Sequence, residues 1–302
     1  MLTPFKNNGA IDYEALTELT EFYLEAGVTG LFANCLSSEM YELHDYEKLN
    51  VIKHVVRLVN GLVPVVACGS FGDTISKQAA FIKEVNDTGV DAVILITSMM
   101  AGQREPDIIL TQRVLQLMEL TGEIRLGLYE CPVPYKRILS PSQLGQLVAT
   151  GRITYLKDTC LDIQQVKAKL AAVNNDAFGL YDAYMVHAVE SLKAGAAGVS
   201  CIQGNFFPEL IVWLCRHYND PVRSEEVNTA QQFLTDRMDL MHDVYPLIAK
   251  YYLQKRGLST TTFTRRKVGA FTNDVKNRMD KLYNDYAYLQ KELEITTSGF
   301  PV

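Results

Sequence analysis

The stretch TGVDAVILI, residues 88–96, joins the end of one helix to an entirely apolar run, and this junction decides the fold. Gly89 suits the end of a helix, since glycine readily adopts the left-handed backbone conformation that commonly follows one. The run Ala92–Ile96 does not alternate between apolar and polar residues, which is typical of a parallel strand covered on both faces. The same junction occurs in AGVTG at residues 26–30 and in AGAAGV at residues 194–199.

Short apolar runs of this kind alternate with amphipathic stretches along the chain. The runs predict eight strands, at residues 2–4, 30–34, 63–67, 92–96, 125–129, 153–157, 178–181 and 198–202. The stretches between them predict helices, among them 13–25, 45–59, 75–87, 107–120 and 162–173, with Thr74, Ser140 and Asp162 as N-terminal caps. Eight βα units within about 215 residues favour the α/β class and a (β/α)8 TIM barrel over an open sheet. No Gly-x-Gly-x-x-Gly sequence follows the first predicted strand, so a dinucleotide-binding sheet is the weaker alternative.

The pattern changes after the predicted barrel. Residues 225–255 and 273–293 predict long helices with no strand between them. We therefore expect residues 1–219 to form the barrel and residues 220–302 to form an α-helical extension packed on it.

The composition limits the partners of the protein. Its 302 residues are 48% hydrophobic and 21% charged and carry a net charge of −6, as in an ordinary globular protein. The longest basic block is Arg265–Lys267, which argues against nucleic acid as the main partner because phosphate binding needs a concentrated cationic surface. The apolar runs are far shorter than the roughly 20 residues that span a bilayer, so we expect no membrane partner. The start MLTPFK has neither a cationic beginning nor an apolar signal core, which predicts a cytoplasmic protein.

The six cysteines are widely spaced, at positions 35, 68, 131, 160, 201 and 215. Without a Cys-x-x-Cys pair or nearby histidines they do not predict a zinc site, and a chain of this length needs no disulfide framework, so we expect reduced thiols. The first five fall at or just after the ends of predicted strands. We interpret them as small residues packed at a crowded barrel mouth, and a metal or redox site is the alternative.

Lys157 ends the predicted strand at residues 153–157. In a parallel barrel the functional site is built at the carboxyl ends of the strands. A lysine enclosed there loses hydration, which favours its uncharged, nucleophilic amine, and such an amine can form a Schiff base with a ketone. The alternative is that Asp158 neutralises Lys157 in an ion pair at the rim, and the position alone leaves both interpretations open.

Other polar residues occupy the ends of neighbouring predicted strands. Tyr129 ends the strand before that of Lys157, where a phenol can move protons to and from a Schiff base, or else serve as a core tyrosine. The turn Asn34–Glu39 offers backbone amides and hydroxyls that can hold a carboxylate, or else cap the next helix. Ser200, in the last predicted strand, is a further candidate for substrate binding.

The chain resembles the dihydrodipicolinate synthase and N-acetylneuraminate lyase superfamily of Schiff-base-forming aldolases, although not a typical dihydrodipicolinate synthase. The resemblance covers nearly the whole chain and rests on TPF at 3–5, SSE at 37–39, Y-x-x-P at 129–132, LKDT at 156–159 and GAAGV at 195–199. It implies Lys157 as the Schiff-base nucleophile, Tyr129 as the proton shuttle, and Ser37 with Ser38 in substrate binding. It also implies pyruvate as the 2-keto acid partner and a homotetramer or homodimer.

Three departures from the family pattern concern the substrate. The turn has Leu36 where the family has a first hydroxyl that relays protons, while Ser37 retains the second hydroxyl. The loop that carries a cross-subunit tyrosine in dihydrodipicolinate synthases has Met100 and no tyrosine here. Their entrance arginine falls on Pro134, with the neighbouring Lys136 or Arg137 as candidates to replace it.

One further likeness points to a hydroxylated substrate. The sequence Tyr181-Asp182 resembles the Tyr-Asp-Glu of the neuraminate lyases, whose acidic residues hold sugar hydroxyls. Asp182 is therefore a candidate ligand for sugar hydroxyls, and a cap at the barrel rim is the alternative.

We therefore expect a lyase that forms a Schiff base at Lys157 without a metal or organic cofactor. It would cleave or form a carbon–carbon bond between pyruvate and an aldehyde, and the expected substrate is a 2-keto-3-deoxy sugar acid or a sialic-acid-like compound. The alternatives are dihydrodipicolinate synthase, which joins pyruvate to aspartate semialdehyde, and a 2-keto-3-deoxy acid dehydratase. Outside enzymes, the alternative is a non-catalytic 2-keto acid sensor, because Leu36 interrupts the proton relay.

Overall fold

The computed structural model describes residues 1–295 and shows two compact units. The first unit contains Met1–Val63, Met185–Val189 and the chain from Cys201 onward, and the second contains Pro64–Tyr184 and Glu190–Ser200. Each unit has its own set of buried apolar side chains.

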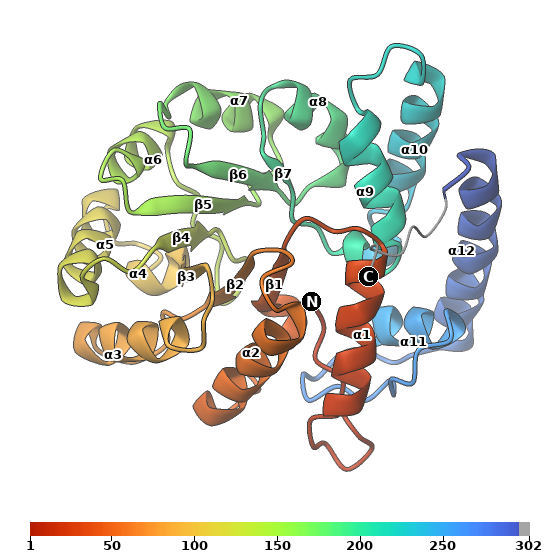
Figure 1. Cartoon of the computed structure of the whole chain (residues 1–302), viewed down its shortest axis with the longest axis horizontal. Helices are drawn as coiled ribbons and strands as arrows, with labels where there is room; N and C mark the ends of the chain where they lie inside the picture. The colour runs from red at the N-terminus through yellow and green to blue at the C-terminus, as the bar shows by residue number, and fades with distance from the viewer. Residues whose placement is uncertain (296–302) are drawn as a thin grey trace. The chain divides into compact units, whose positions relative to one another are not determined.

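The second unit is built on a parallel sheet. Its strands are β2 (Val65–Cys68), β3 (Ala92–Ile96), β4 (Leu126–Tyr129), β5 (Ile153–Asp158), β6 (Gly179–Asp182) and β7 (Gly198–Val199). Each strand pairs in parallel with the next one along the chain, so their carboxyl ends meet at one edge of the sheet (Figure 1). Every residue of β3 and β4 is buried, as expected for strands covered on both faces.

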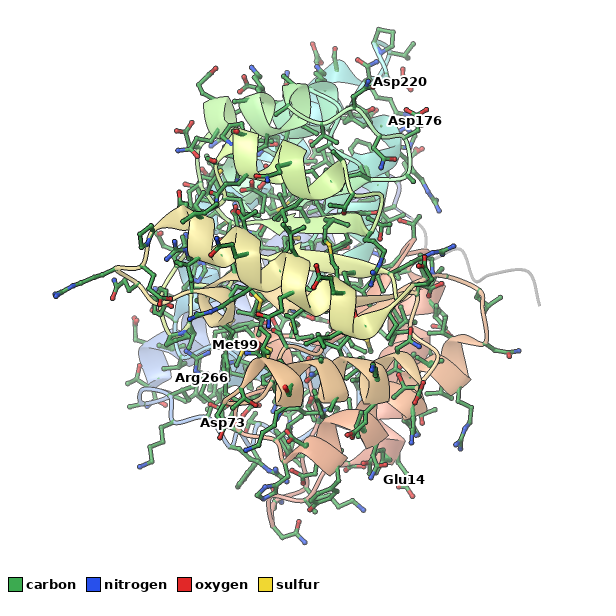
Figure 2. The ribbon with its side chains drawn as sticks, turned by 90° about the vertical axis from the view of Figure 1, so that its left-hand side faces the viewer. Glu14, Asp73, Met99, Asp176, Asp220 and Arg266 are labelled. Carbon is green, nitrogen blue, oxygen red and sulfur yellow. The ribbon has the colours of Figure 1, made fainter. Side chains whose placement is uncertain are left out.

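Helices cover the outer side of this sheet (Figure 1). They are α3 (Ile75–Asn86), α4 (Thr97–Met100), α5 (Asp107–Thr121), α6 (Pro141–Val148) and α7 (Ile163–Ala171), and α8 (Ala188–Lys193) precedes β7. The predicted caps are confirmed, since Thr74, Ser140 and Asp162 each accept a backbone N–H of the first helical turn. Exposed carboxylates such as Asp73 and Asp176 project from the surface of this unit (Figure 2).

The first unit is mainly helical and has one strand among its described residues, β1 (Leu31–Asn34). Its main helices are α1 (Tyr13–Glu25), α2 (Asp45–Val59), α9 (Pro208–His217), α10 (Ser224–Asp236), α11 (Leu247–Lys255) and α12 (Asn273–Glu292). Aromatic rings fill its core, with ring centroids 5.0 Å apart for Phe207 and Tyr286 and 5.4 Å apart for Phe206 and Tyr252. Such pairs contribute about 0.5–1.5 kcal/mol each beyond the area that they bury.

The helix predicted over residues 225–255 is wrong in its length. The structure has two helices there, α10 and α11, separated by a segment that contains a 3₁₀ turn at Leu240–His242. Pro246 immediately precedes α11, and proline interrupts a helix because it lacks a backbone N–H and its ring clashes with the preceding turn. The helix predicted over residues 273–293 is confirmed as α12 to within one residue.

The first predicted strand, at residues 2–4, is also wrong. The segment forms no ladder, and the nearest pairing is an isolated antiparallel bridge between Phe5 and Ile11. Pro4 has no backbone N–H to donate to a neighbouring strand, and three residues offer too few other groups to pair.

The α/β class with a parallel sheet is confirmed. The strand predicted at residues 198–202 is reduced to β7, and residues 1–295 contain seven strands in all. Closure of an eight-stranded barrel and the domain boundary after residue 219 stay predictions, and residues 296–302 of the predicted extension lie outside the described part. Within residues 1–295 no helix combines the length and the apolar character needed to cross a membrane.

Candidate active site

The register of two neighbouring strands brings Tyr129 and Lys157 together. Tyr129 ends β4 and pairs with Lys157 of β5. Residues paired in a parallel sheet point to the same face, and the Nζ atom of Lys157 lies 5.0 Å from the centroid of the Tyr129 ring. Both side chains are buried, with 7% of Lys157 and 3% of Tyr129 exposed. A phenol and an amine at this separation can act on the same small substrate.

A second tyrosine shares this face, noted in the sequence only together with Asp182 and not as a candidate of its own. Tyr181 of β6 is in register with Lys157, and its ring stacks on that of Tyr155 with centroids 4.6 Å apart. Gly179 and Gly198 make room for the ring, because a Cβ at Gly179 would lie 2.8 Å from it. Burial raises the pKa of Tyr181, so its phenol stays protonated at neutral pH. Its position at the end of a predicted strand, like that of Lys157, was the available signal.

Tyr129, Lys157 and Tyr181 form a row across three neighbouring strands. Asp182, the predicted ligand for sugar hydroxyls, directly follows the last residue of this row. It is in register with Asp158, is 1% exposed, and its Oδ1 accepts the N–H of Tyr184 at 2.9 Å. A bond of this kind is typical of a residue that caps a turn. Ser200 is linked to the row because its Oγ accepts a hydrogen bond from the hydroxyl of Tyr155 at 3.2 Å. Substrate binding by Asp182 and Ser200 stays a prediction.

The residues that directly follow the tyrosine and the lysine belong to a buried charge cluster, formed by Glu130, Asp158 and Lys169. The Nζ atom of Lys169, from α7, lies 2.6 Å from a carboxylate oxygen of Glu130 and 2.6 Å from one of Asp158, and all three side chains are 0% exposed. Glu130 also accepts the N–H groups of Leu139 at 2.9 Å and Thr159 at 3.2 Å. The cluster therefore clamps the ends of β4 and β5 to a helix.

The contacts of Asp158 show which groups its carboxylate binds. Its Oδ2 pairs with Lys169, and its Oδ1 accepts the N–H of Cys160 at 2.7 Å. Both oxygens of Asp158 thus have partners other than Lys157. This arrangement favours the nucleophile interpretation of Lys157 over an ion pair with Asp158 at the rim.

The cluster also shifts the pKa values of Glu130, of Lys169 and of the neighbouring Cys160 thiol. Burial and the neighbouring charge of Asp158 raise the pKa of Glu130 to about 7. Burial opposes the charge on Lys169, but the two carboxylates outweigh it and raise the pKa of this amine. Burial, reinforced by Asp158, raises the pKa of the Cys160 thiol to about 12. Of these three groups, Glu130 is the one that titrates near neutral pH.

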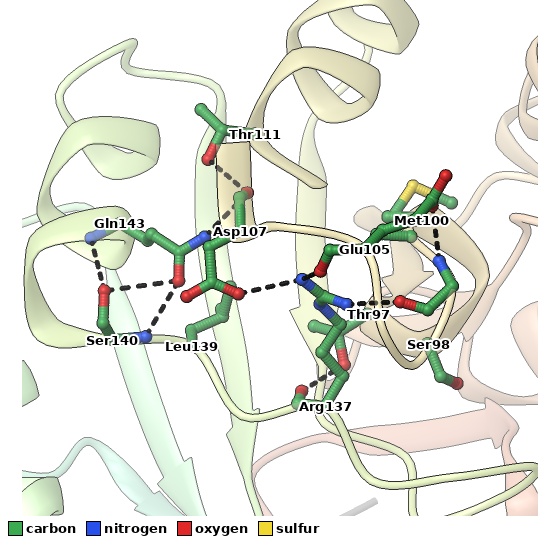
Figure 3. A network of polar contacts seen from close by, with 12 residues as sticks. Thr97, Ser98, Met100, Glu105, Asp107, Thr111, Arg137, Leu139, Ser140 and Gln143 are labelled. Carbon is green, nitrogen blue, oxygen red and sulfur yellow. Dashed lines mark hydrogen bonds and ion pairs between the residues drawn. The ribbon is translucent and has the colours of Figure 1, made fainter. Parts of the chain in front are cut away.

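The two candidates to replace the entrance arginine, Arg137 and Lys136, hold loops together, and Figure 3 shows the contacts of Arg137. Arg137 donates to the backbone carbonyls of Gly102 at 2.6 Å and Glu105 at 2.8 Å and forms an ion pair with Asp107 at 2.8 Å. Lys136 donates to a backbone carbonyl in the loop after β5 at 2.7 Å. These contacts tie the loop after β4 to the loop before α5 and to the loop after β5.

In the first unit, the turn after β1 uses the hydroxyl of Ser38 within the fold. Its Oγ accepts the N–H of Cys35 at 3.0 Å and lies 3.0 Å and 3.1 Å from the carbonyl oxygens of Met1 and Ala33. One hydroxyl proton cannot serve these carbonyls and a substrate as well. The geometry therefore favours Ser37 over Ser38 as a ligand.

A chain of hydrogen bonds orients Ser37. Its Oγ lies 2.7 Å from the hydroxyl of Tyr245, which donates to it and accepts a bond from the amide of Asn205 at 2.9 Å. The amide oxygen of Asn205 accepts from Tyr23 at 2.8 Å. Burial raises the pKa of Tyr245 far above its usual range, so this phenol remains a neutral donor. Because the Ser37 oxygen already accepts a bond, its own proton is available for a carboxylate.

The departures from the family pattern have structural positions. Leu36 begins a 3₁₀ turn at Leu36–Ser38, and Met100 ends α4 and is fully buried, so Met100 is a core residue. All six cysteines are free thiols. Over residues 1–295 no three His, Cys, Asp or Glu side chains are grouped as they would be to hold a metal ion.

Comparison with known proteins gives consistent matches over nearly the full length. The model of the dihydrodipicolinate synthetase family matches residues 1–285. A 4-hydroxy-tetrahydrodipicolinate synthase from Pseudoalteromonas atlantica is 23% identical over 289 residues, covering 96% of this chain and 97% of that protein. The structure of YagE, a prophage protein of E. coli K12 in complex with pyruvate, has a TM-score of 0.83 at 19% identity and covers 98% of this chain and 97% of its own. CdNal from Clostridium difficile, in complex with mannosamine, has a TM-score of 0.83 at 17% identity and covers 94% of this chain and 96% of its own.

The loop network of Arg137 predicts a stability effect. Replacing Arg137 by Met removes the donor from the carbonyls of Gly102 and Glu105 and from the carboxylate of Asp107. We expect a loss of about 2–3 kcal/mol in the free energy of unfolding, measured by urea denaturation. Arg104→Met, at an exposed position of the loop before α5, is the matched control and should change stability by less than about 0.5 kcal/mol. Equal stabilities of the two variants would contradict the role of the network.

Proposed function

The chain belongs to the dihydrodipicolinate synthetase family and is a carbon–carbon lyase of the Schiff-base type, and from this premise we propose that Lys157 is the lysine that forms the Schiff base with a 2-keto acid. The observation that carries the proposal is the register pairing of Lys157 with Tyr129, with the amine 5.0 Å from the ring centroid. The engagement of Asp158 by Lys169 supports it, because that carboxylate has partners other than Lys157.

In the proposed reaction the uncharged amine of Lys157 attacks the ketone carbon of the substrate. A carbon–nitrogen bond forms, the carbonyl oxygen takes one proton from the amine and one from the Tyr129 phenol and leaves as water, and a protonated imine remains. The Tyr129 phenolate then accepts the proton of the C4 hydroxyl, the C3–C4 bond breaks, and the aldehyde leaves while the electron pair forms an enamine. Protonation of the enamine at C3 and hydrolysis of the imine release pyruvate and restore the amine.

Ser37 is the proposed ligand of the substrate carboxylate. Its oxygen accepts a bond from Tyr245 at 2.7 Å, so its proton can be donated. The backbone amides of the same turn offer further donors for an anion. Tyr245, held by Asn205, acts as a positioning residue for Ser37.

The scheme needs no metal or organic cofactor, because the protonated imine itself withdraws electrons from the bond that breaks. YagE and a dihydrodipicolinate synthase from Acinetobacter baumannii, both solved with pyruvate, support pyruvate as the 2-keto acid. Likeness in fold over 94–98% of this chain supports the closed barrel expected from the sequence, although seven of its eight predicted strands are formed in residues 1–295. The homotetrameric or homodimeric state and the cytoplasmic location expected from the sequence are part of the proposal.

We propose that the substrate that is cleaved is a 2-keto-3-deoxy sugar acid, so that the second product is a hydroxylated aldehyde. Three hydroxyl groups belong to this part of the sheet. Tyr181 and Tyr155 lie on the same face as Lys157, and Ser200 accepts a hydrogen bond from the hydroxyl of Tyr155. Each can pair with a substrate hydroxyl, and an unpaired buried polar group costs about 1–3 kcal/mol. The mannosamine complex of CdNal supports a hydroxylated substrate in this fold.

Trapping tests the nucleophile. Sodium borohydride reduction in the presence of pyruvate should leave a covalent adduct on Lys157, located by peptide mass mapping. Lys157→Met should give no adduct, whereas Lys193→Met, at an exposed lysine, should trap as the wild type does. An adduct on another lysine, or none at saturating pyruvate, would falsify the mechanism.

Removal of one oxygen atom tests the proton shuttle. Tyr129→Phe should keep the fold, measured by circular dichroism, and lower turnover by roughly 10²–10⁴, the range for a positioned acid–base group. Tyr155→Phe should lower turnover less than Tyr129→Phe does, because the hydroxyl of Tyr155 bonds to Ser200 in the structure. Near-normal turnover of a folded Tyr129→Phe protein would assign Tyr129 to core packing.

Competition between substrates tests the aldehyde. We expect kcat/KM for cleavage of 2-keto-3-deoxy sugar acids to exceed that for condensation of pyruvate with aspartate semialdehyde by at least about tenfold, or roughly 1.4 kcal/mol in the transition state. Faster formation of dihydrodipicolinate precursors would overturn the substrate class and leave the Schiff base in place. Loss of water without cleavage would indicate the dehydratase, and binding without turnover would indicate the sensor.

A further inference from the structure

We propose that the buried charge cluster of Glu130, Asp158 and Lys169 positions the catalytic pair, and that the protonation of Glu130 switches this positioning. The inference rests on the proposed Schiff-base chemistry at Lys157. The cluster attaches at the residues next to the chemistry, since Glu130 follows Tyr129 and Asp158 follows Lys157.

Backbone and side-chain bonds of Glu130 both reach the strand that carries the lysine. Its N–H donates to the carbonyl of Lys157 at 3.2 Å, and its own carbonyl accepts the hydroxyl of Thr159 at 2.6 Å. Its carboxylate accepts the N–H of Thr159 at 3.2 Å. Lys169 then joins this carboxylate to that of Asp158. A change in the Glu130 carboxylate therefore acts on the separation of the Tyr129 ring and the Lys157 amine.

The cost of burying this cluster argues for a role beyond stability. All three side chains are fully buried, and with both carboxylates ionised the cluster carries one excess negative charge. Removing charges from water costs several kcal/mol per ion, and apolar residues of similar volume often replace buried ion pairs without loss of stability. A cluster of this kind next to the reacting groups therefore indicates that it holds the Tyr129 ring and the Lys157 amine in a fixed relative position.

The donors around Glu130 determine what protonation does. Three hydrogens point at its carboxylate, from the Nζ of Lys169 and the N–H groups of Leu139 and Thr159. A proton on the carboxyl group removes the negative charge that holds Lys169 and leaves the protonated oxygen a weaker acceptor, so these bonds weaken. The charged and titratable groups that face Glu130 or its partners are Lys169 of α7, Asp158 of β5 and the Cys160 thiol beside Asp158. Ionised Glu130 is therefore the clamped, active form.

The sign of the pH dependence separates this role from a purely structural one. Burial raises the pKa of Glu130 from 4.5 to about 7, so the folded protein binds this proton more tightly than the unfolded chain does. The contribution of Glu130 to stability is therefore present below about pH 4.5 and is lost as the pH rises through about 7. Activity should rise as Glu130 of the folded protein ionises near pH 7, because ionisation tightens the clamp. A structural residue would move stability and activity in the same direction.

Glu130→Gln tests the proposal, because the neutral amide resembles the protonated carboxyl group. The assay is exchange of the pyruvate methyl hydrogens with deuterated water, followed by proton NMR, which needs the Schiff base and proton transfer and needs no aldehyde. We expect the variant to equal the wild type below pH 6 and to be at least tenfold slower at pH 8.5, with the ratio changing near pH 7. The variant should also lose the decline in unfolding free energy that the wild type shows between pH 5 and 7.

Glu209→Gln is the matched control. Glu209 is a buried carboxylate paired with Arg256 at 2.5 Å in the first unit, and this variant should exchange pyruvate hydrogens as the wild type does at every pH. A ratio for Glu130→Gln that does not depend on pH, or the same pH-dependent loss in Glu209→Gln, overturns the positioning role.

Variants of Lys169 provide a second test should Glu130→Gln fail to fold. Lys169→Arg keeps the cation and its donors and should keep the pH-dependent rise in exchange, whereas Lys169→Met should lose it, and equal profiles for the two overturn the proposal. Absence of exchange in the wild type at every pH removes the Schiff-base chemistry and the positioning role together. Exchange in the wild type with an unchanged profile in Glu130→Gln removes the positioning role alone.

Discussion

The register between β4, β5 and β6 is the constraint on which the site depends. It places Tyr129, Lys157 and Tyr181 in one row across three strands. A slip of one residue would turn each of these side chains to the other face. Gly127 supports the register, because a Cβ there would lie 2.4 Å from the side chain of Ile94 and 2.9 Å from the Cβ of Tyr155.

Alternation along the strands separates two kinds of chemistry. The row that contains Lys157 otherwise carries phenols, while the next residues, Glu130 and Asp158, meet the cation of α7. The first unit uses a similar device, since the buried Glu39 pairs with Lys250 at 2.7 Å and accepts the N–H of Arg266 at 2.8 Å. Glu39 follows Ser37 by two residues, so this ion pair fixes the turn that presents the serine. In each unit, buried ionic contacts hold the backbone next to a candidate site residue, Lys157 in one unit and Ser37 in the other.

The sequence predicted much of this arrangement because its signals are local. An unbroken apolar run such as Ala92–Ile96 and a capping residue such as Thr74 report the structure of their own segment, and both elements lie where they were expected. The buried charge cluster and the partner of Ser37 could not be found in this way. Lys169 looks like any lysine of an amphipathic helix, and Tyr245 is separated from Ser37 by most of the chain. Their roles follow from tertiary contacts, which leave no periodic pattern in the sequence. Pro246, by contrast, is a local signal, and it predicts the break between α10 and α11 better than the apolar pattern around it does.

Proteins with this fold must be told apart by side chains that differ between them, because the backbone frame is the same. A dihydrodipicolinate synthase at 22% identity and the mannosamine-bound CdNal at 17% match this chain with the same TM-score of 0.83, so the fold does not select the aldehyde. Tyr181 is a residue through which this chain can select, because its ring stands beside Lys157 and depends on Gly179 and Gly198 for space. Since the ring of Tyr181 also stacks on that of Tyr155, neither ring can move without disturbing the other. The register of the sheet and its glycines therefore fix which phenols share the face of the amine.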